Sequence, residues 1–300
     1  MDKNFYNQSS ATQLGWEPTW FGERYFDKML VRAIKKFQKA YGLISDGLCG
    51  PSTFRRVWTE RQSKIDEFKP SGDPYYSDYI VFNSRFYPIE WDKVVLWSEE
   101  GGLSARPGTY YNYSGRAERS TKLFVNHWDA CLSSHSCQRV LDRRNLSVHF
   151  LIDNDGTIYQ TLDMQHGAWH AGNINRKAIG VEISNAFYTK YQDTYIERGH
   201  GPRPIIESAA IHGNEIGPFL DFYPIQITAL KTLWKAVHNA TGIPYQTPLD
   251  QCGKTSTKYE QDAAYGKFTG FISHYHVSKN KQDCAGLDIE SLIQEIVDSD

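Results

Sequence analysis

The stretch Ser147–Gln160, "SVHFLIDNDGTIYQ", decides the fold class of this chain. Two apolar runs, Val148–Ile152 and Thr157–Thr161, flank the tetrapeptide Asp153–Gly156. Neighbouring Asp, Asn and Gly residues between apolar runs favour a tight reversal of the chain. The stretch is therefore predicted to form a β-hairpin.

Other apolar segments around this hairpin predict a sheet covered by helices. Three further strands are predicted at Leu123–Asn126, Ala178–Ile183 and Phe271–His274. Apolar residues at helical spacing predict amphipathic helices over residues 227–237 and 289–296. Segments 184–224 and 245–268 show weak periodicity and are predicted to be long loops. The predicted fold class is α/β, with a mixed central β-sheet flanked by helices.

The first part of the chain has a different pattern and predicts a small all-helical domain. Apolar residues recur at helical spacing between Leu30 and Tyr41, and Gly42 is placed to end that helix. The loop "SDGLCGPST" follows, and Pro51 suits the first position of a second helix. The Pro- and Gly-containing stretch "KIDEFKPSGDPYYSD" predicts a boundary. The expected division is a helical module over residues 1–70, a linker over 71–80 and a larger second domain over 81–300.

Composition limits the classes of partner. The 300 residues carry a net charge of −2, which argues against a dedicated nucleic-acid-binding protein. No apolar run approaches the roughly 18 residues of a membrane span, and the polar start shows no signal peptide, so neither a membrane anchor nor secretion is expected. Five scattered cysteines favour a reduced compartment over a disulfide framework. The protein is expected to be a monomer made in the cytoplasm.

Three segments carry side chains suited to catalysis. His127 ends an apolar run in "FVNHWDA", and Glu182 interrupts another in "AIGVEIS". The segment "ISHYHVSKNKQDC", residues 272–284, gathers histidine, lysine, aspartate and cysteine. A buried carboxylate is costly unless it is paired or used. Two histidines and a carboxylate at separate strand ends can hold zinc and leave a fourth position open for water, although spacing alone is a weak signal.

Residues 120–290 resemble the zinc-dependent N-acetylmuramoyl-L-alanine amidases of the amidase-2 type, which are related to the peptidoglycan recognition proteins. The resemblance is carried by "VNHWDA", "SVHFLIDNDGTIYQ", "GAWHAGNINRKAIGVEIS" and "SHYHV" with "KQD", in this order. It implies one zinc ion, held by His127, His274 and Asp283. It further implies that Glu182 is the catalytic acid/base and that Lys281 stabilises developing negative charge. The implied reaction cleaves the amide between N-acetylmuramic acid and L-alanine.

Two of these ligands have neighbours that could replace them. His276 shares a strand face with His274, and the family pattern favours His274, the first of the two. Asp283 is followed by Cys284, where the family commonly has proline, and the register set by Lys281 favours Asp283. Three further side chains are expected to bind substrate or, alternatively, to pack against the sheet: His149, Trp169 and His170.

The N-terminal segment resembles the peptidoglycan-binding-domain-1 family. The matching pairs are Phe37-Gln38, Gly42-Leu43, Asp46-Gly47 and Gly50-Pro51, the last followed by Ser52-Thr53. The resemblance implies a module that anchors an enzyme to peptidoglycan. Together the two parts suggest a bacteriophage endolysin released through a holin-type pore. The alternatives are a non-catalytic peptidoglycan recognition protein and a cytoplasmic wall-recycling amidase.

Overall fold

The structure is a computed structural model that describes residues 2–62, 77, 79–114 and 119–299. Its first part is helical, as predicted, and consists of α1 (Lys3–Leu14), the 3₁₀ helix η1 (Pro18–Phe21), α2 (Lys28–Ala40) and α3 (Pro51–Gln62).

The sequence did not predict α1, whose apolar residues form no clear stripe. Asp2 caps the start of α1 by accepting from the backbone N–H groups of Asn4 and Phe5. The expected linker lies outside the described residues except for Ser77, Tyr79 and Ile80.

A single glutamine ties the loop between α2 and α3 together. The side-chain amide of Gln38 donates to Asp46 Oδ1, at 2.8 Å, and to Thr53 Oγ1, at 3.0 Å. Its carbonyl oxygen accepts from the backbone N–H of Gly47 at 2.8 Å. Gly47 has φ +80°, and a Cβ there would lie 2.7 Å from Val31, so only glycine fits. The spaced Gln, Asp-Gly and Thr of the sequence pattern thus have a structural reason.

The second part contains a six-stranded mixed sheet in the order β14-β5-β9-β6-β7-β3. Only β6 and β7, the hairpin predicted from "SVHFLIDNDGTIYQ", run antiparallel. The sheet strands are β3 (Val94–Leu96), β5 (Leu123–Trp128), β6 (Phe150–Ile152), β7 (Ile158–Gln160), β9 (Ala178–Ile183) and β14 (Gly270–Ser273). The larger helices are α4 (Ser134–Arg143), α6 (Pro224–Thr241) and α8 (Ile289–Ser299).

The two faces of the sheet are covered differently, because successive side chains of a strand point to opposite sides. Phe124 and Val181 lie on the face that packs against α6 and α8 in the largest apolar core. Leu151 and Tyr159 lie on the opposite face and pack with α4 in a second core. His127 and Glu182 are on this second face, toward the carboxyl ends of their strands.

Several short elements surround the sheet. They are β1 (Tyr79–Phe82), β2 (Arg85–Pro88), β4 (Tyr110–Tyr111), β8 (Gly167–Ala168), β10 (Ile205–Ile206), β11 (Ala209–Ile211), β12 (Asn214–Ile216), β13 (Phe219–Leu220), α5 (Gln192–Glu197), α7 (Gln261–Ala264) and the 3₁₀ helices η2 (Gly172–Ile174), η3 (Thr189–Tyr191) and η4 (His274–His276). Segment 184–224, predicted as one long loop, therefore contains α5 and two small hairpin-like pairs. These elements are too short to show a periodicity in the sequence.

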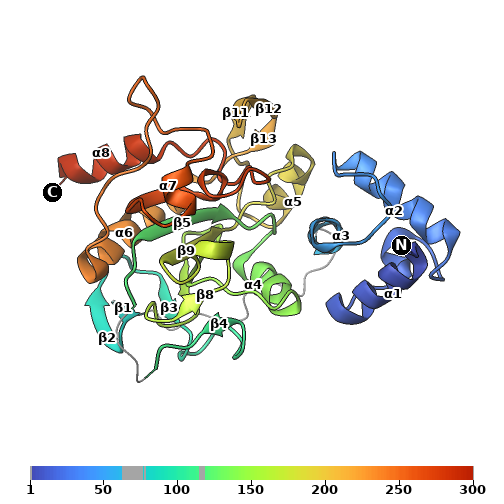
Figure 1. Ribbon diagram of the computed structural model, residues 1–300, viewed down its shortest axis with the longest axis horizontal. Coiled ribbons are helices and arrows are strands. Elements are labelled where there is room, and N and C mark those ends of the chain that lie inside the picture. Colours follow the sequence, from blue (N-terminus) through green and yellow to red (C-terminus); the bar gives the residue numbers. More distant parts are fainter. Residues whose placement is uncertain (1, 63–76, 78, 115–118, 300) are drawn as a thin grey trace.

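The helical module packs directly on the sheet domain, with α3 beside α4 (Figure 1). Trp58 of α3 donates its indole N–H to Ser136 Oγ at 2.9 Å, and the guanidinium of Arg143 lies 4.3 Å from the Trp58 ring. The second core is shared: Leu30, Phe54 and Trp58 of the module join Val140 and Leu141 of α4. None of the helices in the described part of the chain is long and apolar enough to cross a membrane.

Candidate active site

The candidate site lies at the carboxyl ends of three neighbouring parallel strands. His127 is near the end of β5, Glu182 is its register partner on β9, and His274 directly follows β14. Asp283 comes from the loop that follows η4. The ends of adjacent parallel strands meet at one sheet edge, where ligands commonly bind in open α/β sheets. Residues far apart in the sequence are brought together in this way.

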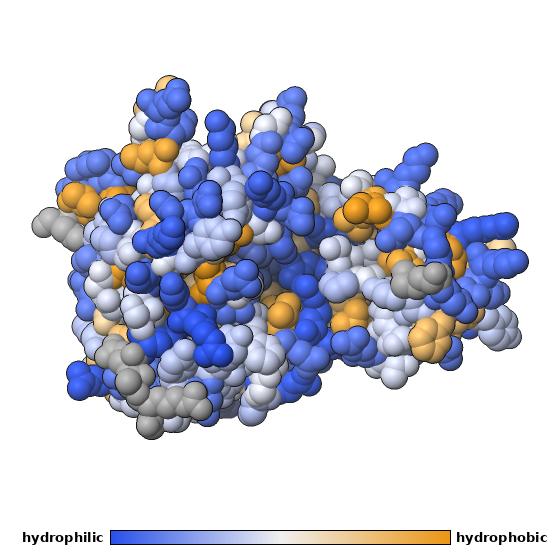
Figure 2. All heavy atoms as spheres, viewed as in Figure 1, coloured by the Kyte–Doolittle hydropathy of each residue, from blue (hydrophilic) through white to orange (hydrophobic). Residues whose placement is uncertain are grey.

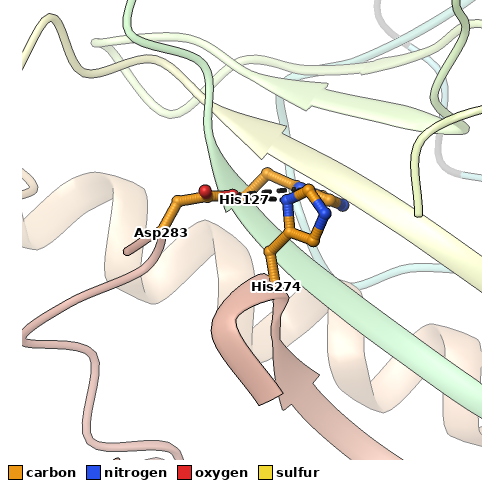
Figure 3. A group of neighbouring side chains, drawn as sticks. All are labelled: His127, His274 and Asp283. Atoms are coloured by element: carbon orange, nitrogen blue, oxygen red, sulfur yellow. Dashed lines mark hydrogen bonds and ion pairs between the residues drawn. The ribbon is translucent and has the colours of Figure 1, made fainter. Parts of the chain in front are cut away.

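Three of the predicted side chains converge on one point (Figure 3). His127 Nδ1 lies 2.9 Å from His274 Nδ1 and 3.2 Å from Asp283 Oδ2, and His274 Nδ1 lies 2.9 Å from the same oxygen. All three residues are buried. Two imidazole nitrogens and a carboxylate oxygen that point at a shared centre are a set that can hold a metal ion.

The protonation of this group suits metal binding. Burial and the neighbouring His274 lower the pKa of His127 to about 3, so that its ring is neutral at pH 7. Burial alone would raise the pKa of Asp283, but His274 and the hydrogen bond with His127 hold it well below the usual value. A neutral imidazole and an ionised carboxylate are the forms that coordinate metals.

His170 contacts His127 on the side away from His274 and Asp283. Its Nδ1 lies 2.9 Å from His127 Nε2, the ring nitrogen that points away from the convergence point. Asn175 Oδ1 accepts from the backbone N–H groups of His170 and Ala171, which fixes the loop. The ring lies over Gly180, where a Cβ would be 2.5 Å away. A partner on the second nitrogen fixes the orientation of a ligating histidine.

Glu182 is a buried carboxyl group without a hydrogen bond on Oε2 among the described residues. It is 5% exposed, and burial raises its pKa to about 8, although the charge of Arg55 opposes this rise. A carboxyl group with a pKa near neutrality can both accept and donate a proton. Lys281 is half-buried, and burial lowers the pKa of its ammonium group, while Asp283 opposes that shift. Both side chains interact electrostatically with Asp283, one of the three converging residues.

The three residues expected at the substrate groove have different positions. His149 is fully buried: Arg119 and the carbonyl of His166 contact its Nε2, and its Nδ1 accepts from the N–H of Gly180. Both ring nitrogens of His149 therefore have partners inside the fold. Trp169 is half-buried, and its ring meets Tyr111 edge-on at 5.6 Å.

The two alternative ligands point elsewhere. His276 Nδ1 accepts from the backbone N–H of Ser273 at 3.0 Å, and its Nε2 lies 2.7 Å from the carbonyl oxygen of Ser256. Both ring nitrogens of His276 are therefore used by the backbone. Cys284 is fully buried in the large apolar core. Neither belongs to the converging group.

Sequence reasoning missed two arginines near this site. Arg55 lies on α3 of the helical module, and Arg144 follows α4. Both line a cleft that also contains Lys281 and Asp283. No sequence signal marks Arg55, because its proximity depends on how the module packs on the sheet domain. Asp129, also missed, accepts from Ser184 and from the N–H of Asn185, and so joins the ends of β5 and β9.

Comparison with known families and structures gives two family matches. Residues 117–286 match the family described as N-acetylmuramoyl-L-alanine amidase, and residues 13–57 match a peptidoglycan binding domain family. A comparison with curated proteins finds no match.

Solved structures with a similar fold include an endolysin N-acetylmuramoyl-L-alanine amidase, LysCS, from Clostridium intestinale, at 16% identity and a TM-score of 0.38, covering 68% of this chain and 95% of that one. AmpDh3 from Pseudomonas aeruginosa, in complex with anhydromuramic pentapeptide, has 19% identity and a TM-score of 0.39, with 65% and 66% covered. The Staphylococcus aureus hydrolase AmiA has 15% identity and a TM-score of 0.37, with 68% and 80% covered.

Proposed function

The chain belongs to the N-acetylmuramoyl-L-alanine amidase family, and on this premise we propose that it is a zinc-dependent hydrolase of peptidoglycan, with His127, His274 and Asp283 as the metal ligands. The substrate bond is the amide that joins N-acetylmuramic acid to L-alanine of the stem peptide. Glu182 is the proposed acid/base, and Lys281 is the proposed group that stabilises negative charge.

The observation that carries this proposal is the convergence of the three ligand atoms. Zinc bonds of about 2.0–2.2 Å in a tetrahedron place ligand atoms about 3.3 Å apart. The distances of 2.9 to 3.2 Å among His127 Nδ1, His274 Nδ1 and Asp283 Oδ2 are slightly shorter and fit that arrangement. The support given to His127 by His170 is typical of a metal-bound histidine.

Each side chain has a task in amide hydrolysis. A zinc ion bound here would activate water and polarise the scissile carbonyl. Glu182 takes a proton from the attacking water and returns it to the leaving amine of L-alanine. Lys281 places a fixed positive charge near the developing oxyanion in a partly buried position, where such a charge is worth more than in water.

The presence of a second domain supports a lytic role in the intact wall. The match of residues 13–57 to a peptidoglycan binding domain supports peptidoglycan as the partner of the helical module. A phage endolysin that is released through a holin-type pore and acts as a monomer fits this combination. A wall-recycling amidase would act on soluble fragments and has less use for a polymer-binding module. A protein that only binds peptidoglycan has no use for Glu182 and Lys281.

The test is digestion of purified peptidoglycan followed by mass spectrometry. We expect free stem peptides that begin at L-alanine, together with glycan strands whose lactyl groups carry no peptide. Products cut between sugars or inside the stem peptide would contradict the proposed bond. Cleavage of soluble muropeptides without cleavage of intact walls would favour the recycling enzyme over the endolysin.

A further inference from the structure

The helical module forms one wall of the cleft that leads to the candidate active site. This cleft has a volume of about 670 Å³ and lies between α2 and α3 on one side and the sheet domain on the other. Ser52 and Arg55 line it from the module, and Lys281 and Asp283 line it from the sheet domain. Figure 2 shows a hollow between the two parts, with hydrophilic surface around it. The module is therefore part of the path to the site.

The cleft is positively charged. Among the described residues, its lining includes the cations Arg55, Arg56, Arg144 and Lys281, whereas the only carboxylates there are Glu215 and Asp283. The guanidinium of Arg56 lies 4.5 Å from the Phe187 ring and 5.0 Å from the Tyr188 ring, so aromatic faces stabilise its charge, although its Nη1, like Arg55 Nε, is buried without an acceptor. Arg55 and Arg144 remain to be explained.

Arg55 and Arg144 make no direct contact with a carboxylate among the described residues, although Glu182 lies near enough to raise the pKa of both guanidinium groups. Neither side chain makes a hydrogen bond or an ion pair within the described part of the chain, and Arg55 Nε is buried without an acceptor. The two like charges affect each other: burial, and next the charge of Arg55, lower the pKa of Arg144 to about 10. Two half-buried guanidinium groups without hydrogen-bond partners among the described residues can bind an anion through charge-assisted hydrogen bonds.

We propose that Arg55 and Arg144 form a binding subsite for a carboxylate of the stem peptide, so that the wall-binding module takes part in substrate selection. This inference rests on the proposed function. The residue after L-alanine in a stem peptide is a γ-linked glutamate with a free α-carboxylate, or its neutral amide. One residue spans roughly 3.5 Å, so this carboxylate lies within reach of groups beside the scissile bond. The subsite distinguishes the acidic form from the amidated form.

The test compares two substrates with wild-type and variant full-length, zinc-loaded protein. The substrates are N-acetylmuramoyl-L-alanyl-D-isoglutamate and the matching isoglutamine compound, which differ only in carboxylate against carboxamide. Arg55→Met should lower kcat/KM for the acid roughly ten- to a hundredfold more than for the amide, because a charge-assisted hydrogen bond is lost, whereas loss of the Arg55 charge near Glu182 acts on both substrates alike. Arg55→Lys should restore part of the preference.

The matched control is Arg61→Met on the same helix, because Arg61 is exposed and lies outside the cleft lining. Arg144→Met, in the other part of the chain, should reproduce the loss for the acid and serves if Arg55→Met fails to fold. Equal losses for both substrates, or no loss for either, would overturn the subsite.

Calorimetric binding of the released acid and amide peptides gives a readout without turnover. If wild-type protein cleaves neither substrate, the proposed function fails. A preference for the acid peptide that disappears in Arg55→Met would then still support the subsite, and equal affinities would overturn it.

Discussion

Glu182 is the residue on which turnover should depend most directly. Glu182→Gln keeps the size of the side chain but removes its ability to accept a proton. We expect cleavage to fall about 10²- to 10⁴-fold, with zinc content and sedimentation with purified walls unchanged. Rates from chromatography of the released peptides, together with metal analysis, check this. Near-normal turnover would remove Glu182 from the mechanism.

Asp283 and Cys284 form a matched pair of neighbours for testing the third ligand. Asp283→Ala should weaken zinc binding by at least roughly tenfold, because one of three ligands and its negative charge are lost. Cys284→Ala should keep zinc, since its thiol lies in the apolar core. Competition with a chelator measures both affinities. Zinc loss in Cys284→Ala but not in Asp283→Ala would reverse the assignment.

At the residue level, the sequence singled out individual polar side chains but did not show which residues would be their neighbours in the fold. His127 and Glu182 stood out as polar residues in apolar runs, and the structure places them as register partners on adjacent strands. Neither segment shows by itself that β5 pairs with β9. The sequence pattern alone was therefore only weak evidence for a metal site. Family resemblance, and not spacing, selected Asp283.

At the scale of elements, α3 and the segment before α5 are joined by a polar contact. Lys190 Nζ lies 2.6 Å from Glu60 Oε2, and Tyr191 donates to the same oxygen at 3.2 Å. Burial opposes ionisation of Glu60, but the hydrogen bonds from Lys190 and Tyr41 lower its pKa from 4.5 to about 2. The carboxylate thus stabilises the folded state above the unfolded pKa, and this contribution is lost as pH falls through the folded one.

Glu60→Gln should therefore lower the free energy of unfolding at pH 7 by about 1 kcal/mol, a modest value because both side chains are partly exposed. The difference between variant and wild type should shrink as pH falls from about 4.5 toward 2. Urea denaturation at a series of pH values measures it. A difference that stays constant over this range would show that the charge of Glu60 is not responsible.

Long periodic elements were predicted well, and short ones were not. Strand β9 was predicted at its observed bounds, and the helix predicted over residues 227–237 lies inside α6, which Gly242 ends with φ +71°. The short pairs β10–β13 and β11–β12 were missed because two or three residues give no period. Helix α4 was also missed, since it is short and rich in serine.

At the scale of the whole molecule, the shared core should make the two parts unfold together. Trp58 is 3% exposed and contacts both the module and α4. Calorimetry of the full chain should show a single transition. Trp58→Ala should lower the free energy of unfolding by about 3–5 kcal/mol and shift that whole transition, whereas Tyr25→Ala, at a side chain that is 71% exposed, should not. Two separated transitions would contradict a common cooperative unit.

The shared core of Leu30, Phe54 and Trp58 with α4 also limits how such a protein can be recombined. Exchanging a domain as an independent cassette requires that each domain bury its own apolar surface. In this chain, a cassette cut between the module and the sheet domain would leave apolar side chains of α4 open to water and invite aggregation. A functional chimera must therefore transplant the α3–α4 interface as a unit, or redesign the exposed face of α4 with polar side chains.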